Sequence, residues 1–269
     1  MKRAHEVEFK VIGEDLQFVE IMLDPRETVI AEAGAMMYMD KAITMDTIFG
    51  DGSSDGESKP LMGKLLSAGK RLITGESLFT TMFTHTGSGK ARVAFAAPYP
   101  GTVLAMKLDE HGGRIICQKD SFLAGARGVQ VGVHFQRKIL TGLFGGEGFI
   151  MQKLEGDGWV FVHAGGTVME RQLAAGERID VDTGCVVAFH SSVDMDVKAV
   201  GGIKSMLFGG EGVFLATLTG PGTVWLQSLP FSRMAGRMLA AAPQSGGKDR
   251  GEGSMLGGIG RLLDGDNSF

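Results

Sequence analysis

Two stretches of the chain, LFGGEGFIMQKL at residues 143–154 and LFGGEGVFLATL at residues 207–218, begin with the same six residues and lie 64 positions apart. The same offset aligns Arg114 with Arg178, and one register holds without a gap from about residue 114 to residue 162. Many differences between the aligned segments keep an apolar residue apolar. We therefore interpret the two segments as copies of one unit.

A third and larger copy is predicted upstream. LDPRETVIAEAG, from Leu23, matches LAAGERIDVDTG, from Leu173, at an offset of 150. TGESLF, ending at Phe79, matches GGEGVF, ending at Phe214, at an offset of 135. The offset falls from 150 to 135 between these two matches, so the first copy carries about 15 extra residues between them. The Gly/Ser-rich segment 49–63 has the composition of a surface loop and is the candidate for this insertion.

One further match completes the alignment of the first copy. PGTVLAMKL, from Pro100, matches PGTVWLQSL, from Pro221, at an offset of 121. THTGSGKARVAFAA then reads as an inserted turn and strand. Within it, TGSGKAR superficially resembles a phosphate-binding loop, but its place between two strand-like runs favours a hairpin turn.

The local pattern indicates β-structure. Short β-branched or aromatic runs are bounded by Gly or Pro, and residues 159–163 alternate Trp, Phe and His with two valines, as the two faces of one strand do. Helical spacing is confined to residues 61–73 and 231–242. We predict an all-β fold of three repeated β-sandwich or double-stranded β-helix-like units in a pseudo-threefold arrangement, plus one or two short helices.

The predicted boundaries follow the copies. They are a first unit at 1–105, a second at 106–170, a third at 171–243 with the C-terminal helix, and a Gly-rich tail at 244–269 that we expect to be flexible.

Composition narrows the class of protein. The chain has 269 residues, a net charge of −4 and a pI near 5.9, and this acidic balance argues against nucleic-acid binding. Cys117 and Cys185 lack metal-ligand spacing and fit a reducing compartment. The sequence contains neither a secretory h-region nor about 18 consecutive apolar residues. We therefore expect a soluble cytoplasmic protein.

Three acidic residues at equivalent positions are the candidate metal ligands: Glu76, Glu147 and Glu211. If the units converge on a pseudo-threefold axis, their carboxylates could hold a hard cation such as Ca²⁺. The alternative is that each carboxylate accepts backbone N–H groups and fixes its own turn before a strand. We favour the turn, since duplication explains the recurrence without a site.

A second acidic set is Glu27, Glu177, Asp180 and Asp182. Glu27 and Glu177 recur at the offset of 150, which indicates that each has a structural role in a turn that leads into a strand. Asp180 and Asp182 alternate on one predicted strand, where a cation site is the alternative to a solvated face. We favour the structural interpretation for all four residues.

Catalytic and cofactor motifs are absent from the sequence. It contains no GxSxG elbow, no P-loop and no HxH or HExxH pair, and its six histidines do not cluster. We predict no enzyme activity and no cofactor.

Several segments together resemble the family named for altered inheritance of mitochondria protein 24. They are LDPRETVIAEAGAMMYM, KRLITGESLF, APYPGTVLAMKL, LFGGEGFI, GERIDVDTGCVVAF and GGEGVFLATLTGPGTVWLQ, within about residues 5–240. The resemblance implies a fold like the tryptophan RNA-binding attenuation protein and homo-oligomers, of which a trimer is one form. It implies no catalytic residues, and the absence of a presequence argues against carrying over a mitochondrial location.

The leading hypothesis is a non-enzymatic oligomeric β scaffold that binds a protein or membrane-associated partner. The alternative is a small-ligand- or metal-binding regulator with its site between repeats, and a weaker alternative is RNA binding. Peripheral membrane contact is an option for the basic segment 59–73, although a helix packed on the β core explains its pattern better.

Overall fold

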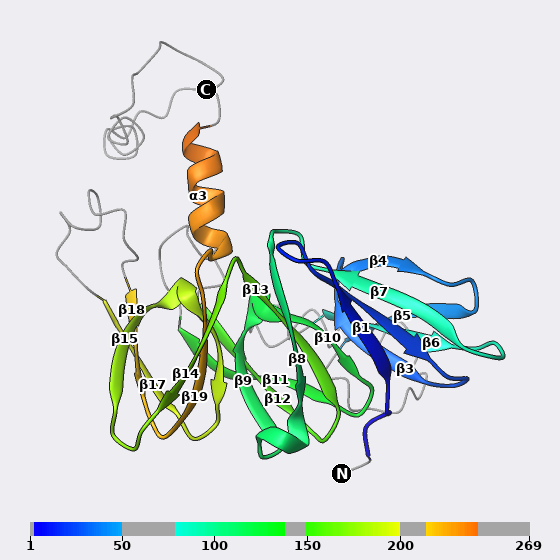
Figure 1. Cartoon of the computed structure of the whole chain (residues 1–269), viewed down its shortest axis with the longest axis horizontal. Coiled ribbons are helices and arrows are strands. Elements are labelled where there is room, and N and C mark those ends of the chain that lie inside the picture. The colour runs from blue at the N-terminus through cyan, green and yellow to red at the C-terminus, as the bar shows by residue number, and fades with distance from the viewer. Residues whose placement is uncertain (1–2, 50–78, 138–148, 200–213, 242–269) are drawn as a thin grey trace, which may run out of the picture. The chain divides into compact units, whose positions relative to one another are not determined.

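A computed structural model describes residues 3–49, 79–137, 149–199 and 214–241 of the chain. Over these residues the fold is mostly β, with four antiparallel sheets and one α-helix, α3 (Phe231–Ala241) (Figure 1). The predicted β class and the helix near 231–242 are confirmed. No helix in the described ranges is long and apolar enough to cross a membrane. The predicted helix at 61–73 and nearly all of the loop at 49–63 lie outside the described residues.

Two sheets contain the N-terminal strands. The first sheet has the order β1-β2-β7-β4, with bounds Glu8–Ile12, Phe18–Leu23, Ala91–Ala96 and Met36–Met39. The second sheet has the order β5-β6-β3-β10-β13-β8, with bounds Ile43–Phe49, Phe79–His85, Thr28–Glu32, Phe122–Ala126, Trp159–Gly165 and Gly101–Lys107.

The C-terminal strands form two more sheets. The third sheet has the order β11-β12-β9-β16-β19-β14, with bounds Gln130–Arg137, Phe149–Glu155, Arg114–Gln118, Val186–His190, Gly222–Gln227 and Val168–Leu173. The fourth has the order β15-β18-β17, with bounds Arg178–Asp182, Phe214–Thr219 and Asp194–Ala199. Short 3₁₀ helices lie at η1 (Leu108–His111), η2 (Lys119–Ser121) and η4 (Thr183–Cys185).

Strand pairing follows the same pattern in three successive sets of six strands, which we call set one (β2–β7), set two (β8–β13) and set three (β14–β19). In each set the fifth strand pairs with the second and the fourth, and the sixth pairs with the first and the third. Each set therefore supplies two three-stranded halves. A break in register recurs in the third strand, at Met36/Tyr38, Phe122/Ala124 and Val186/Ala188.

Two pairings link the sets. β3 of set one pairs with β10 of set two, and β9 of set two pairs with β16 of set three. Each link joins two three-stranded halves into a six-stranded sheet. Among the described strands no pairing joins β15 of set three to β4 of set one, so pairing does not close the sets into a ring. The predicted pseudo-threefold arrangement and the domain boundaries stay predictions. The described residues up to Ala235 belong to one compact unit.

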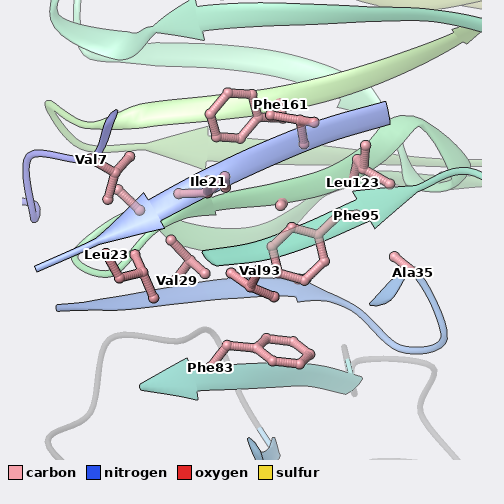
Figure 2. Close-up of a cluster of buried hydrophobic side chains, with 14 of the residues drawn as sticks. Val7, Ile21, Leu23, Val29, Ala35, Phe83, Val93, Phe95, Leu123 and Phe161 are labelled. Carbon is pink, nitrogen blue, oxygen red and sulfur yellow. The ribbon is translucent and has the colours of Figure 1, made fainter. Parts of the chain in front are cut away.

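Three buried clusters fill the spaces between successive sheets. The first cluster joins side chains of the first and second sheets, including Phe95 of β7 and Phe83 of β6, whose ring centroids lie 5.0 Å apart (Figure 2). The second lies between the second and third sheets, and the third between the third and fourth. β13 serves two clusters because its residues alternate: Phe161 faces the first and Val160 the second.

Two interpretations of the segment before Pro100 are wrong. The offset of 121 aligns β8 with β19, the sixth strand of set three. Among the described strands, however, β8 pairs with β13 alone, whereas β7 has the two partners of a sixth strand, β2 and β4. The segment 91–96 is therefore not an inserted strand. TGSGKAR is not a hairpin turn either, because β6 and β7 belong to different sheets. A turn sequence gives no sign of whether the next strand pairs back or crosses to the facing sheet.

Candidate functional site

The candidate metal ligands Glu76, Glu147 and Glu211 lie outside the described residues. Their convergence on one site therefore stays a prediction. Within the described ranges no three His, Cys, Asp or Glu side chains are grouped as metal ligands.

Glu27 and Glu177 each close their own turn, as the sequence indicated. The Glu27 carboxylate accepts the Asp24 N–H at 2.9 Å, and the Glu177 carboxylate accepts the Ala174 N–H at 2.8 Å. In both turns the glutamate's own N–H donates back to the same partner's carbonyl at 3.0 Å. The hydrogen bonds from the Ala174 N–H and from Arg171 lower the pKa of Glu177. Both carboxylates are thus occupied by local structure.

Asp180 and Asp182 also have separate structural partners. Asp180 accepts a hydrogen bond from the Thr217 hydroxyl at 2.6 Å. Asp182 caps η4 through the Gly184 N–H at 2.8 Å and forms an ion pair with Arg233 at 3.2 Å. Their carboxylates therefore serve a cross-strand contact and a helix cap, which supports the structural interpretation over a shared cation.

The expectation that the histidines do not cluster is wrong for one pair. His111 of η1 and His190 of β16 lie 79 positions apart, yet His111 Nδ1 and His190 Nε2 are 2.9 Å apart. The link between β9 and β16 places His190 opposite Ile115, close to the residues that follow η1. Sequence spacing could not show this proximity, because it depends on pairing between two sets.

The hydrogen bonds around this pair indicate which tautomer His190 adopts. The Thr223 N–H donates to His190 Nδ1 at 3.3 Å, so a neutral His190 carries its proton on Nε2 and donates to His111. Burial and the neighbouring His111 lower the pKa of His190. Trp225 packs edge-on against both imidazoles and donates its N–H to Glu170 at 3.1 Å.

His163 of β13 is the most deeply enclosed of the perturbed histidines. Its side chain is buried against the Tyr99 ring, with centroids 4.6 Å apart, and neither ring nitrogen has a hydrogen-bond partner among the described residues. Burial lowers its pKa to about 4. A protonated imidazole is therefore strongly disfavoured in the folded protein.

The lowered pKa of His163 predicts that the stability of the protein depends on pH. The folded pKa is below the ordinary value of 6.5, so the unfolded chain binds the proton first as pH falls. Stability from the neutral form is complete above pH 6.5 and is lost between 6.5 and about 4, by on the order of 2–3 kcal/mol. His163→Leu should remove that loss in urea unfolding at pH 7 and pH 4.5. Equal pH dependence in both proteins would contradict the assignment.

Strand β4 presents an unusual surface. Its residues Met36, Met37, Tyr38 and Met39 are 37%, 56%, 37% and 37% exposed. Eight described strands end a sheet and have a single partner strand: β1, β4, β5, β8, β11, β14, β15 and β17. All of them except β4 contain at least one charged residue. Charges on an edge strand oppose further pairing, and β4 lacks this protection.

The corresponding strands of the other two sets are enclosed. β10 (FLAGA) is buried at every position, and β16 (VVAFH) is buried at all positions except the half-buried His190. The difference arises from the links, because β3 covers the edge of β10 and β9 covers the edge of β16. β4 has no such neighbour in the described chain, so its apolar side chains remain in solvent.

The complementary open edge is β15, in the fourth sheet. Its counterparts β3 and β9 each have a second partner in the next set, whereas β15 pairs with β18 alone among the described strands. Ile179 and Val181 of β15 are half-buried. The chain therefore ends in two unmatched three-stranded halves, one bounded by β4 and one by β15, which we call the two open edges.

Residues 9–229 match the family described as Mitochondrial biogenesis AIM24. The chain belongs to this family. It is 32% identical over 240 residues to an uncharacterised protein of Streptococcus pyogenes serotype M6, a match that covers 87% of this chain and 91% of that protein. The family resemblance seen in the sequence is thereby confirmed.

A crystal structure of a Streptococcus pyogenes protein is similar to this AIM24-family chain. The TM-score is 0.68 at 25% sequence identity, and the similarity covers 87% of this chain and 99% of the solved one. The fold described above is thus shared with a solved relative, over nearly the whole length of that relative.

Proposed function

We propose that this AIM24-family chain is a non-enzymatic β scaffold that forms a homo-oligomer and holds a protein or membrane-associated partner. The observation that carries the proposal is β4, an uncharged edge strand whose three methionines and one tyrosine are exposed. Exposed apolar strand edges mark surfaces that take up another strand. The surface suits binding rather than chemistry.

The acidic residues support a structural rather than a catalytic role. Glu27 and Glu177 close turns, Asp182 caps a 3₁₀ helix, and Asp180 holds a cross-strand hydroxyl. A general acid or base needs a carboxylate that is available to a substrate. These four are already engaged by their own neighbours.

The recurring sets support assembly by repetition. We infer that sets one, two and three descend from one duplicated β-sandwich unit, since all three share one pairing pattern. In sets two and three, the strands from β9 to β11 and those from β15 to β17 also start 64 residues apart, at 114, 122 and 130 and at 178, 186 and 194. Because the sets within the chain pair through edge strands, the same kind of strand pairing can join further copies of the chain. A trimer is one form that such an oligomer takes.

The experiment is a native mass measurement of the full chain over a range of concentrations, paired with an affinity pull-down from cross-linked source cells. We expect masses at multiples of the 28.5 kDa chain and enrichment of the same partner in replicate captures. A chain that stays monomeric at every concentration would overturn the oligomeric part of the proposal. Turnover of a substrate in an activity screen would overturn the non-enzymatic part.

A further inference from the structure

We propose that His111 and His190 form a pH-sensitive joint between set two and set three, which is closed while both imidazoles are neutral and opens when the pair takes up a proton. The inference goes beyond the proposed scaffold role and does not depend on assembly of several copies. His111 ends η1 of set two, and His190 ends β16 of set three. The pair therefore adds a side-chain contact to the strand pairing of β9 with β16.

Both nitrogen lone pairs of the neutral pair already accept a hydrogen bond. The Thr223 N–H donates to His190 Nδ1 at 3.3 Å, and the neutral His190 donates from Nε2 to His111 Nδ1 across 2.9 Å. An added proton needs a lone pair on one of the two rings. Protonation of either ring therefore breaks one of these two contacts.

The His190 ring also ends the ladder between two strands. The pairing of β16 with β19 reaches Phe189, which lies opposite Val224. The next N–H along β19, that of Thr223, is bonded to the His190 ring. The Thr223 amide thus reports the state of the joint, because it loses this acceptor when His190 Nδ1 takes a proton.

The surroundings of the pair favour the neutral form. Burial and the neighbouring His111 lower the pKa of His190, and the carboxylate of Glu170 on β14 opposes this shift without cancelling it. Glu170 also accepts the Trp225 N–H at 3.1 Å. The strands β16 and β19 carry no other charged residue. The remaining charged residues of η1, β9 and β14 are all exposed: Asp109, Glu110, Arg114 and Arg171.

Falling pH favours the open joint. Two imidazolium charges 2.9 Å apart repel each other strongly, so the closed pair cannot hold two protons. When the joint opens, water solvates the His190 ring and its pKa returns toward 6.5. Opening therefore takes up a proton. The stability of the closed joint is complete above pH 6.5 and is lost as pH falls through the lower pKa of the closed His190.

Amide exchange of the full chain, measured residue by residue between pH 7.5 and 5, tests the joint. We expect exchange of the Thr223 amide, corrected for the intrinsic rate at each pH, to rise by up to about tenfold for each unit that pH falls below 6.5. It should exchange faster than the amide of Phe161 on the central strand β13 at every pH below 6.5, because only the joint has to open.

Trp225 supplies a second readout. Its ring packs edge-on against both imidazoles, with centroids 5.7 Å from His111 and 5.2 Å from His190. In a Trp159→Phe chain it is the only tryptophan. A protonated imidazole quenches a neighbouring indole more strongly than a neutral one does, so the emission should fall over the pH range in which Thr223 exchange rises.

Two variants remove the titrating ring at position 190. His190→Asn keeps an oxygen acceptor for the Thr223 N–H, and His190→Gln keeps an N–H donor for His111. Either variant should make the corrected exchange of Thr223 independent of pH. The matched control is His134→Gln, which removes a β11 histidine whose pKa is also lowered by burial. The control should keep the response of the unchanged chain.

The inference is overturned by any of three results. Corrected Thr223 exchange that stays constant from pH 7.5 to 5 would show that the pair remains closed. The same pH dependence in the position-190 variants would assign the response to another group. Equal exchange rates of Thr223 and Phe161 at each pH would show that the amide opens only with the whole protein, a comparison that needs no variant.

Discussion

Phe161→Ala is expected to lower the free energy of unfolding by about 3–5 kcal/mol, the cost typical of removing a buried phenylalanine side chain. Phe161 is fully buried on the central strand β13. Its ring packs edge-on against Phe9, with centroids 4.9 Å apart, and contributes to the cluster between the first and second sheets (Figure 2). Truncation leaves a cavity that well-packed neighbours from two sheets cannot fill.

Urea unfolding followed by tryptophan fluorescence measures this effect, since Trp159 lies two residues away and also contacts Phe9. Phe161→Leu is the matched control, because it keeps most of the apolar volume and should cost less than about 1.5 kcal/mol. A loss below about 1 kcal/mol in the alanine variant would mean that the first cluster is less closely packed than the structure shows.

The second large effect concerns assembly. Met37→Lys combined with Met39→Lys should weaken self-association by about 100-fold, corresponding to on the order of 3 kcal/mol. The two methionines are 56% and 37% exposed on β4, and in the proposed homo-oligomer they become covered by a second copy. The change removes apolar contact area and introduces two ammonium groups at an edge that now lacks charge.

Sedimentation velocity at several concentrations measures the association. The matched control is Met45→Lys combined with Met169→Lys, since both residues are exposed methionines on other single-partner strands. The control protein should associate as the unchanged chain does. Equal weakening by both double variants would show that added charge alone, and not the β4 edge, is responsible.

The local structure of this fold could be predicted from the sequence, because it depends on short-range patterns. The offset of 64 correctly aligns the starts of β9, β10 and β11 with those of β15, β16 and β17, and the repeated Glu27 and Glu177 turns are as expected. Alternation in residues 159–163 correctly predicted a strand with two different faces.

The open edges could not be predicted, because exposure there depends on which strands pair between sets. MMYM at residues 36–39 and FLAGA at residues 122–126 both lack charged residues, yet the first is exposed and the second buried. The sequence gives the composition of each strand but not its neighbours. The same dependence hid the His111–His190 contact, which forms where β9 and β16 pair.

Hydrogen–deuterium exchange as a function of protein concentration tests the central claim most directly. If β4 joins two copies, the peptide covering 36–39 should exchange more slowly as concentration rises, in step with the oligomer mass. The edge strands β5 and β17 should exchange at an unchanged rate, since they lie outside the β4 surface. Oligomers whose β4 amides exchange as fast as those of the monomer would contradict the account.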